Sequence, residues 1–264
     1  MIEPSSLRLV SVLIAKKAVE YLRMRNISTR ILASKEGDVT RAFDIEVEKL
    51  IIDLIKEFLP KSLIITEEEG ELYLDPNPEY IIVLDPVDGS NNYASRIPWC
   101  AVNIAIAYKS AESLNDIVAS TIASIFTDDV YSFSIEEGVL HNEKPIQKSE
   151  KPNEIIIVYA DTLEEYAIAH RYRETFGNIK IRSLGSISMD LTLIIKNSIE
   201  AVIDLRHKLR NVDIAAAYPM IRASGGHIIL LNKEIPHIKY LEKGYSIIAA
   251  PSKEYIDRVL KILY

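Results

Sequence analysis

The chain has 264 residues and 48% of them are hydrophobic, which is enough for one large domain or two closely packed halves and excludes a disordered chain. Its 31 basic and 38 acidic residues give a net charge of −7, which argues against a nucleic-acid-binding protein. The single cysteine, Cys100, excludes an intramolecular disulfide framework and a cysteine-based zinc site, and it favours a reducing compartment, the cytoplasm.

The N-terminal part is predicted to form two helices joined by a loop. Apolar residues recur at helical spacing over residues 5–24 and 45–58, and the polar segment 34–40 between them predicts a mobile loop. The apolar stretch 7–15 contains Arg8 and runs into two lysines, so it predicts an amphipathic helix rather than a signal peptide. No apolar run approaches membrane-spanning length. The expected partner is therefore a small molecule, neither a nucleic acid nor a membrane.

The rest of the chain is predicted to contain strands first and then alternating strands and helices. The β-rich runs are residues 63–66, 80–84, 101–108, 117–125 and 130–135. After Gly138 the predicted strands are 154–159, 179–182, 201–205, 227–231 and 246–250, and the predicted helices are 163–175, 186–196, 213–223 and 253–263. No low-complexity linker separates the two patterns. We expect an α+β fold with halves 1–137 and 138–264 and a site in the crevice between them.

The most informative motif follows the predicted strand 80–84, where the sequence Asp-Pro-Val-Asp-Gly-Ser-Asn-Asn occupies residues 85–92. Asp85 and Asp88 would repel each other on an irregular turn, and a hard cation such as magnesium or calcium would hold them together. Gly89 allows close backbone approach, and its amide and that of Ser90 are candidates for binding an anion. The spacing does not match a calcium-binding EF-hand loop. The alternative is a turn whose two aspartates only accept hydrogen bonds from backbone amides.

Two further acidic positions have the same two interpretations. Glu67 begins a run of three glutamates directly after the predicted strand 63–66, and it is the predicted metal-facing member; otherwise the run is a solvated edge. Asp213 begins a predicted helix rich in alanine, so it is either a metal ligand or a simple N-cap.

Jointly these motifs resemble the inositol monophosphatase family. The resemblance rests on residues 66–68, 85–92, 212–216 and 223–226, in the family's order and approximate spacing, and it extends over residues 35–226. This family belongs with the fructose-1,6-bisphosphatases in a lithium-sensitive, magnesium-dependent phosphatase superfamily, whose fold is a layered α-β-α-β-α sandwich. The residues before Asp213, including Arg206 and Arg210, look most like the archaeal branch that acts on both inositol phosphates and fructose bisphosphate.

The resemblance implies a metal centre built from acidic side chains. One Mg²⁺ would be held by Glu67, Asp85 and the backbone carbonyl of Val87, and a second by Asp85, Asp88 and Asp213. Two or three ions are expected, and Mn²⁺ can replace Mg²⁺. Such ions neutralise the phosphate oxygens, lower the pKa of a bound water and stabilise the leaving alkoxide, so that no covalent phospho-enzyme is needed.

The resemblance also implies a proton pathway and a substrate pocket. The expected catalytic residues are Glu67, Ser90 and Asp44: Ser90 stands where the family usually has Thr, and its hydroxyl would pass a proton toward Glu67 or Asp44. The alternative for Asp44 is a plain helix cap at the start of the predicted helix 45–58. The expected substrate-binding residues are Asp88, Gly89, Ser90, Arg182, Ser186, Ile187 and Arg206. Arginine suits a second phosphate because it binds in a bidentate manner, although each arginine alone is also typical of a solvated surface.

The sequence therefore predicts a Mg²⁺-dependent phosphoric monoester hydrolase that acts on inositol monophosphate, fructose 1,6-bisphosphate or both, and the resemblance implies a homodimer. One alternative is a phosphatase for 3′-phosphoadenosine 5′-phosphate or NADP, but no adenine-stacking pocket is visible in the sequence. The alternative from another class is a catalytically inactive metal-binding regulatory protein.

Overall fold

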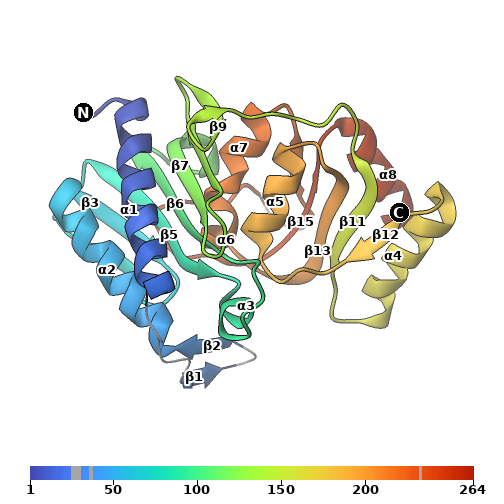
Figure 1. The fold of residues 1–264 in the computed structure, drawn as a ribbon, viewed down its shortest axis with the longest axis horizontal. Coiled ribbons are helices and arrows are strands. Elements are labelled where there is room, and N and C mark those ends of the chain that lie inside the picture. Colours follow the sequence, from blue (N-terminus) through green and yellow to red (C-terminus); the bar gives the residue numbers. More distant parts are fainter. Residues whose placement is uncertain (25–30, 36–37, 232–233) are drawn as a thin grey trace.

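The central strands of the first large sheet are buried along nearly their whole length, so the sheet is covered by other layers on both faces. The strands over residues 80–88, 101–108 and 117–124 are buried at almost every position, as expected for strands covered on both faces. The computed structural model describes residues 1–24, 31–35, 38–231 and 234–264. In this part of the chain two large sheets lie side by side, with helices between them and on both outer faces (Figure 1).

The first large sheet has eight strands, in the order β10-β9-β8-β7-β6-β5-β3-β4. Its strands are β3 (Ser62–Thr66), β4 (Gly70–Tyr73), β5 (Tyr80–Asp88), β6 (Ala101–Tyr108), β7 (Ile117–Ser124), β8 (Val130–Ser134), β9 (Gly138–His141) and β10 (Lys144–Pro145). Strands β3 and β5 are parallel, whereas the other neighbours are antiparallel. The parallel pair therefore brings the C-terminal ends of β3 and β5 to the same edge of the sheet.

The second large sheet has five strands, in the order β12-β11-β13-β15-β14. Its strands are β11 (Asn153–Tyr159), β12 (Lys180–Arg182), β13 (Ile199–Arg210), β14 (His227–Leu230) and β15 (Lys243–Ala250). Strand β11 runs parallel to both β12 and β13, and β15 runs antiparallel to β13 and β14. The predicted division between residues 137 and 138 stays a prediction.

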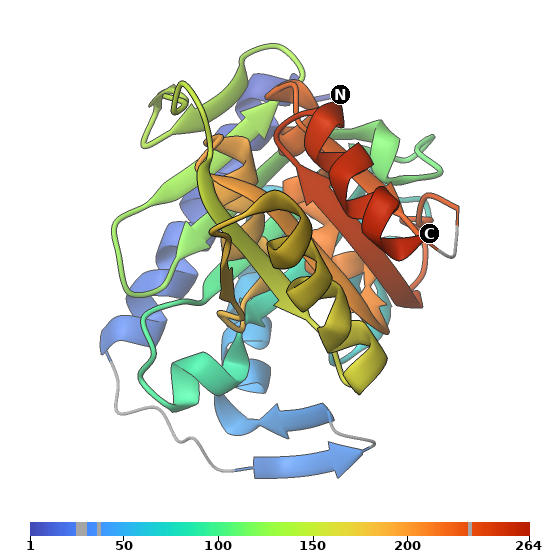
Figure 2. The same cartoon turned by 90° about the vertical axis from the view of Figure 1, so that its right-hand side faces the viewer.

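The helices fill three layers around the two sheets. They are α1 (Pro4–Met24), α2 (Ala42–Phe58), α3 (Ser90–Ala94), α4 (Leu163–Phe176), α5 (Ile187–Ile195), α6 (Asn211–Ala215), α7 (Ala217–Ala223) and α8 (Lys253–Leu263), with a 3₁₀ turn η1 (Leu114–Asp116). Along β5, Ile82 and Leu84 pack with α1 and α2, whereas Ile81 and Val83 pack with α5, α6 and α7. Helices α4 and α8 cover the outer face of the second sheet (Figure 2). The predicted α-β-α-β-α layering is confirmed.

The helix and strand boundaries agree with the sequence prediction where periodicity is strong. Helix α1, strand β6 and helix α8 match the predicted ranges to within one residue. The predicted helix 213–223 instead divides into α6 and α7 at Ala216. None of the helices in the described ranges combines the length and apolar character needed to cross a lipid bilayer.

The prediction of a loop over residues 34–40 was wrong for residues 34–35 and 38–40, which the structure describes as strands. Strand β1 (Ile31–Lys35) pairs antiparallel with β2 (Asp38–Arg41), with Ser34 opposite Val39. Residues 36–37 lie outside the described residues. Cross-strand hydrogen bonds satisfy these backbone groups whatever the side chains are, so the polar side-chain pattern did not reveal the pairing.

Strand β5 extends further than the sequence predicted. It was expected to end at Leu84, but it continues to Asp88, and its pairing with β6 is irregular between Asp85 and Asp88. Pro86 has no N–H to donate, which interrupts the hydrogen-bond ladder without ending the extended backbone. This irregular strand end carries the first acidic motif.

The packing of α2 on α3 gives a stability prediction. Phe43 in α2 is fully buried, and its ring meets that of Tyr93 at 4.6 Å between centroids. Phe43→Ala should lower the free energy of unfolding by about 3–5 kcal/mol because burial is lost and a cavity is left. Ile45→Ala on the same helix is the control, since Ile45 is 44% exposed and its loss should cost less than about 1 kcal/mol. Urea denaturation measures both, and equal losses would contradict this view of the core.

Candidate active site

Three carboxylates from distant parts of the sequence meet at the edge of the first sheet. Thr66, the last residue of β3, pairs with Leu84 of β5, so Glu67 and Asp85 follow side by side. Asp213 comes from α6, and one oxygen of each of the three carboxylates lies within 4.8 Å of the others. Oxygen ligands grouped in this way are typical of Mg²⁺ and Ca²⁺ sites.

Asp85 is the most buried member of this cluster, with 2% of its surface exposed. Burial, followed by the charges of Asp88, Glu67 and Asp213, raises the pKa of Asp85 well above its ordinary value, and Arg210 opposes this rise. A nearby cation favours the ionised form of a carboxylate. The carboxylate oxygens of this cluster therefore fit a divalent metal ion, whose positive charge would offset the repulsion among them.

Asp88 lies beside the cluster but is bound to the start of α5. Its Oδ2 accepts hydrogen bonds from the Ser186 hydroxyl at 2.6 Å, from the Ser188 amide at 2.7 Å and from the Ser188 hydroxyl. Its Oδ1 accepts one longer bond, 3.3 Å, from the Ile187 amide. Of the four predicted carboxylates, the structure thus groups three within ligand distance and places the fourth next to them, facing α5.

Ser90 and Asp44 are in contact, as the predicted proton pathway requires. The Ser90 hydroxyl lies 3.1 Å from Asp44 Oδ1 and 2.9 Å from the carbonyl oxygen of Val87, so its single proton has two alternative acceptors. Asp44 Oδ2 also accepts a bond from the amide of Arg41, the N-cap of α2. Because α2 begins at Ala42, Asp44 lies in its first turn and is not the cap of a helix starting at Ile45, as the alternative had predicted. Burial raises the pKa of Asp44 to about 7.

Two glycines, the predicted Gly89 and Gly185, lie in a close contact between the start of α3 and the segment before α5. Gly89 has φ +86°, and a Cβ there would lie 3.1 Å from the Cys100 and Ser186 Cβ atoms. Gly185 has φ +90°, and a Cβ there would lie 2.9 Å from the side-chain amide of Asn92. Both the left-handed backbone and the lack of space require glycine. This close contact places Ser186 and Ile187 against Asp88.

The two predicted arginines are placed differently. Arg206 lines the cavity beside the carboxylates, forms a bidentate pair with the buried Asp204 (3.2 and 2.6 Å), and stacks 4.6 Å from the centre of the Tyr159 ring. Arg182 is exposed on β12, where its guanidinium donates to the carbonyl oxygen of Ile181. It is not among the described residues that line the cavity.

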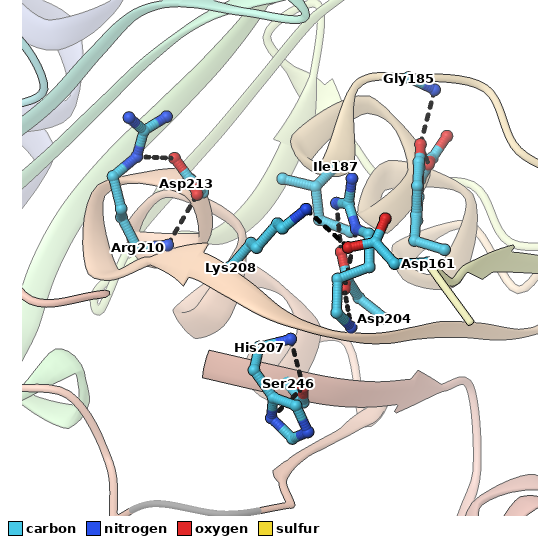
Figure 3. A network of polar contacts seen from close by, with 12 residues as sticks. Asp161, Gly185, Ile187, Asp204, His207, Lys208, Arg210, Asp213 and Ser246 are labelled. Atoms are coloured by element: carbon cyan, nitrogen blue, oxygen red, sulfur yellow. Dashed lines mark hydrogen bonds and ion pairs between the residues drawn. The ribbon is translucent and has the colours of Figure 1, made fainter. Parts of the chain in front are cut away.

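The cavity has a volume of about 880 Å³ and contains charges of both signs. The three clustered carboxylates line it together with Arg206, Lys208, Arg210 and Lys243. Figure 3 shows Lys208 reaching toward Asp161 and Arg210 lying against Asp213, all close to β13. The cavity thus combines three carboxylates that could hold a metal ion with four basic side chains, which suits a small substrate with more than one anionic oxygen.

A buried network behind the cavity was missed by the sequence reasoning. Asp190 is fully buried; its Oδ1 accepts a bond from the Trp99 indole at 2.8 Å, and its Oδ2 accepts one from the Tyr159 hydroxyl at 2.6 Å. The Tyr159 hydroxyl in turn accepts a bond from the Gly185 amide. The signal that could have identified Asp190 was its position as the one charged residue of the largely apolar run 187–195.

Arg210 was also missed as a site residue. Its Nη1 lies 2.5 Å from Glu67 Oε1, and its Nε lies 3.2 Å from Asp213 Oδ1. The signal was its position three residues before Asp213, which is the spacing of a capping box.

Comparisons with known proteins agree with the geometry. The family model described as the inositol monophosphatase family matches residues 3–264. An inositol-1-monophosphatase of Aeropyrum pernix is 33% identical over 230 residues, 86% of this chain and 85% of the relative. A fructose-1,6-bisphosphatase/inositol-1-monophosphatase of Methanothermobacter thermautotrophicus is 26% identical over 86% of this chain and 84% of the relative. A solved structure from Pyrococcus horikoshii, described as a hypothetical protein with similarities to inositol-1 monophosphatase, superimposes with a TM-score of 0.80 at 25% identity, covering 98% of this chain and 99% of its own.

The buried network gives a prediction for the pH dependence of stability. Burial raises the pKa of Asp190 to about 7, so the folded state holds a proton there that the unfolded chain releases near pH 4. The free energy of unfolding should therefore fall as pH rises from about 4 to 7, by at most about 1.4 kcal/mol per pH unit from this group. Asp190→Asn should make that fall less steep, measured by urea unfolding at pH 5, 6 and 7. Asp53→Asn, which changes an exposed acid on α2, is the control, and identical slopes in the two variants would contradict the assignment.

Proposed function

This chain belongs to the inositol monophosphatase family and is a phosphoric monoester hydrolase, and we propose that it releases phosphate from a small phosphorylated sugar or polyol with Mg²⁺ as cofactor. Inositol monophosphate and fructose 1,6-bisphosphate are the proposed substrates. The observation that carries the proposal is the group of Glu67, Asp85 and Asp213 on the wall of a large cavity that also has a basic side.

The metal would be held by residues that already lie together. Glu67, Asp85 and Asp213 are the proposed central ligands, and Asp88 and the Val87 carbonyl complete the predicted set. Asp88 Oδ1 accepts one long hydrogen bond, which leaves it acceptor capacity toward a cation. We propose two or three Mg²⁺ ions, replaceable by Mn²⁺. When bound, they would supply Lewis-acid stabilisation of the phosphate oxygens and an activated water.

The protein's own residues would handle the proton and the orientation of the phosphate. The Ser90 hydroxyl, in contact with Asp44, is the proposed relay for a proton from the attacking water, with Asp44 or Glu67 as the final acceptor. A buried carboxyl with a pKa near 7 suits this task at neutral pH. The amides of Gly89 and Ser90, at the tight start of α3, are proposed to bind the phosphate.

The basic side of the cavity supports a substrate with a second anionic group. Arg206, Lys208 and Lys243 line it, and Arg206 is fixed in place by Asp204 and Tyr159. This arrangement suits fructose 1,6-bisphosphate, which carries two phosphates. Among the described lining residues the aromatic rings are those of Tyr159, which Arg206 covers, and His207, whose Nδ1 lies 2.9 Å from the Ser246 hydroxyl oxygen.

Three statements stay predictions from the sequence and the family resemblance: the cytoplasmic location, the homodimer and the sensitivity to lithium. Substrate binding by Arg182 also stays a prediction from the sequence. The lining of the cavity favours Arg206 instead, and substitutions of the two arginines separate these assignments. The buried Cys100 is consistent with a reducing compartment.

The proposed metal role predicts a loss of phosphatase activity in one glutamate variant and not in its neighbour. Glu67→Gln should reduce phosphate release from inositol 1-phosphate and fructose 1,6-bisphosphate by at least about 100-fold, because a charged metal ligand is lost. Glu69→Gln is the matched control, since Glu69 is exposed two residues away. A colorimetric phosphate assay with Mg²⁺ measures both. Equal activity of the two variants would contradict the site, and Mg²⁺ binding by the wild type without release from any phosphomonoester would favour the inactive regulatory protein.

The basic wall predicts a difference between substrates. Arg206→Gln should lower kcat/KM for fructose 1,6-bisphosphate by about 10-fold or more, and kcat/KM for inositol 1-phosphate less, because a charge-assisted hydrogen bond to the second phosphate is lost. Arg182→Gln makes the same change outside the cavity and should leave both values unaltered. A loss in Arg182→Gln alone would reverse the assignment. Faster turnover of 3′-phosphoadenosine 5′-phosphate or NADP by the wild type would favour the nucleotide alternative.

A further inference from the structure

Arg210 connects two carboxylates of the cluster, Glu67, which follows β3, and Asp213 of α6. Its guanidinium pairs with Glu67 at 2.5 Å and with Asp213 at 3.2 Å. Its backbone amide donates to the other oxygen of Asp213 at 2.7 Å. Figure 3 shows the side chain lying along Asp213 at the end of β13. The cluster therefore contains an internal positive charge.

This positive charge and a metal ion would use the same carboxylate oxygens. Asp213 Oδ1 and Glu67 Oε1 each accept a guanidinium N–H, which occupies acceptor positions that a metal ligand needs. Arginine stays protonated at all ordinary pH values, so it cannot release these oxygens by losing its proton. It can release them only by moving.

We propose that Arg210 is the exchangeable counter-cation of the carboxylate cluster, so that a divalent ion binds Glu67 and Asp213 by displacing its guanidinium. The inference rests on the proposed metal site and concerns the role of this chain's own arginine there. In this arrangement Arg210 stabilises the crowded carboxylates when Mg²⁺ is chelated, and it lowers the affinity of the site for Mg²⁺.

The surroundings of Arg210 allow the movement. Its side chain is 20% exposed and lines the cavity, so it has a path away from the carboxylates that does not pass through the core. Lys208 and Lys243 line the same cavity, and their charges would repel a guanidinium moved into it. An anionic phosphate in the cavity would remove that repulsion and accept the guanidinium. Phosphate binding and metal binding should therefore assist each other.

A purely positioning role makes the opposite prediction. If Arg210 only aligned Glu67 and Asp213 for the metal, its removal would leave the ligands misaligned and would weaken Mg²⁺ binding, as removal of groups that orient ligands typically does. The exchange role predicts tighter binding after the same change. The sign of the change in affinity thus separates the two roles.

The test is a calorimetric titration of Mg²⁺ into substrate-free protein. Arg210→Gln, which removes the charge and keeps most of the length, should lower the Mg²⁺ dissociation constant by roughly 10-fold, because the positive charge that competes with the ion is lost. Arg210→Lys keeps the charge and should stay within about threefold of the wild type. Arg258→Gln, which removes a charge from α8 outside the cavity, should bind Mg²⁺ as the wild type does. Unchanged or weaker binding by Arg210→Gln overturns the proposal.

The change in Tm on adding Mg²⁺ is a second measurement, and it distinguishes tighter Mg²⁺ binding from simple misfolding of the variant. With Mg²⁺ chelated, Arg210→Gln should have a lower Tm than the wild type, because the carboxylates lose their counter-charge. Adding Mg²⁺ should raise its Tm by more than it raises that of the wild type, because the variant binds the ion more tightly. A lower Tm with an equal or smaller Mg²⁺-induced rise overturns the proposal. Absence of phosphatase activity in a wild type that binds Mg²⁺ would instead count against the proposed function alone.

Discussion

The repulsion between carboxylates held in a small, partly buried volume is the constraint on which the site depends. The sheet creates this repulsion: the parallel pairing of β3 and β5 places Glu67, directly after β3, beside Asp85 within β5, and α6 adds Asp213. Such a group is unfavourable unless positive charge is brought to it. The fold supplies part of that positive charge through Arg210, and a metal ion, on which the family depends, would supply the rest. The repulsion among these carboxylates thus lowers the stability of the fold, and the same repulsion favours the binding of a cation.

The same constraint explains why the two sheets must be fixed firmly relative to each other. Asp88, at the end of β5, accepts its hydrogen bonds from the start of α5, and Asn92 of α3 donates to the carbonyl oxygen of Leu184 at 2.6 Å. Behind them Asp190 joins Trp99 to Tyr159. Small shifts between the sheets would alter the distances among carboxylates contributed from both sides. Tight glycine contacts and buried hydrogen bonds at this junction limit such shifts.

The sequence predicted the layers and the acidic residues because both leave strong local signals. Apolar periodicity located most of the helices and strands, and the motif at residues 85–92 with Glu67 and Asp213 identified the three clustered acids. Contacts that depend on packing left weaker signals. The orientation of Asp88 toward α5, the bridge made by Arg210 and the network at Asp190 each join segments that lie far apart in the sequence. Backbone pairing in β1 and β2 was missed for another reason, since its hydrogen bonds do not depend on side-chain type.

The charges along β13 are placed so that one strand would serve both the proposed metal site and the proposed substrate contacts. Arg206, Lys208 and Arg210 alternate along it, and each pairs with an acid: Asp204, Asp161 and Asp213 respectively. The pairing of β13 with β15 is irregular between Asp204 and Leu209, which leaves this segment free to follow the cavity wall. A cation already held by an acid loses less conformational freedom when an anion binds beside it, so this pairing would favour the phosphate binding proposed for these cations. Of the three cations, Arg210 is paired with acids that are the proposed metal ligands, so the proposed exchange between protein charge and metal charge would take place at the C-terminal end of β13.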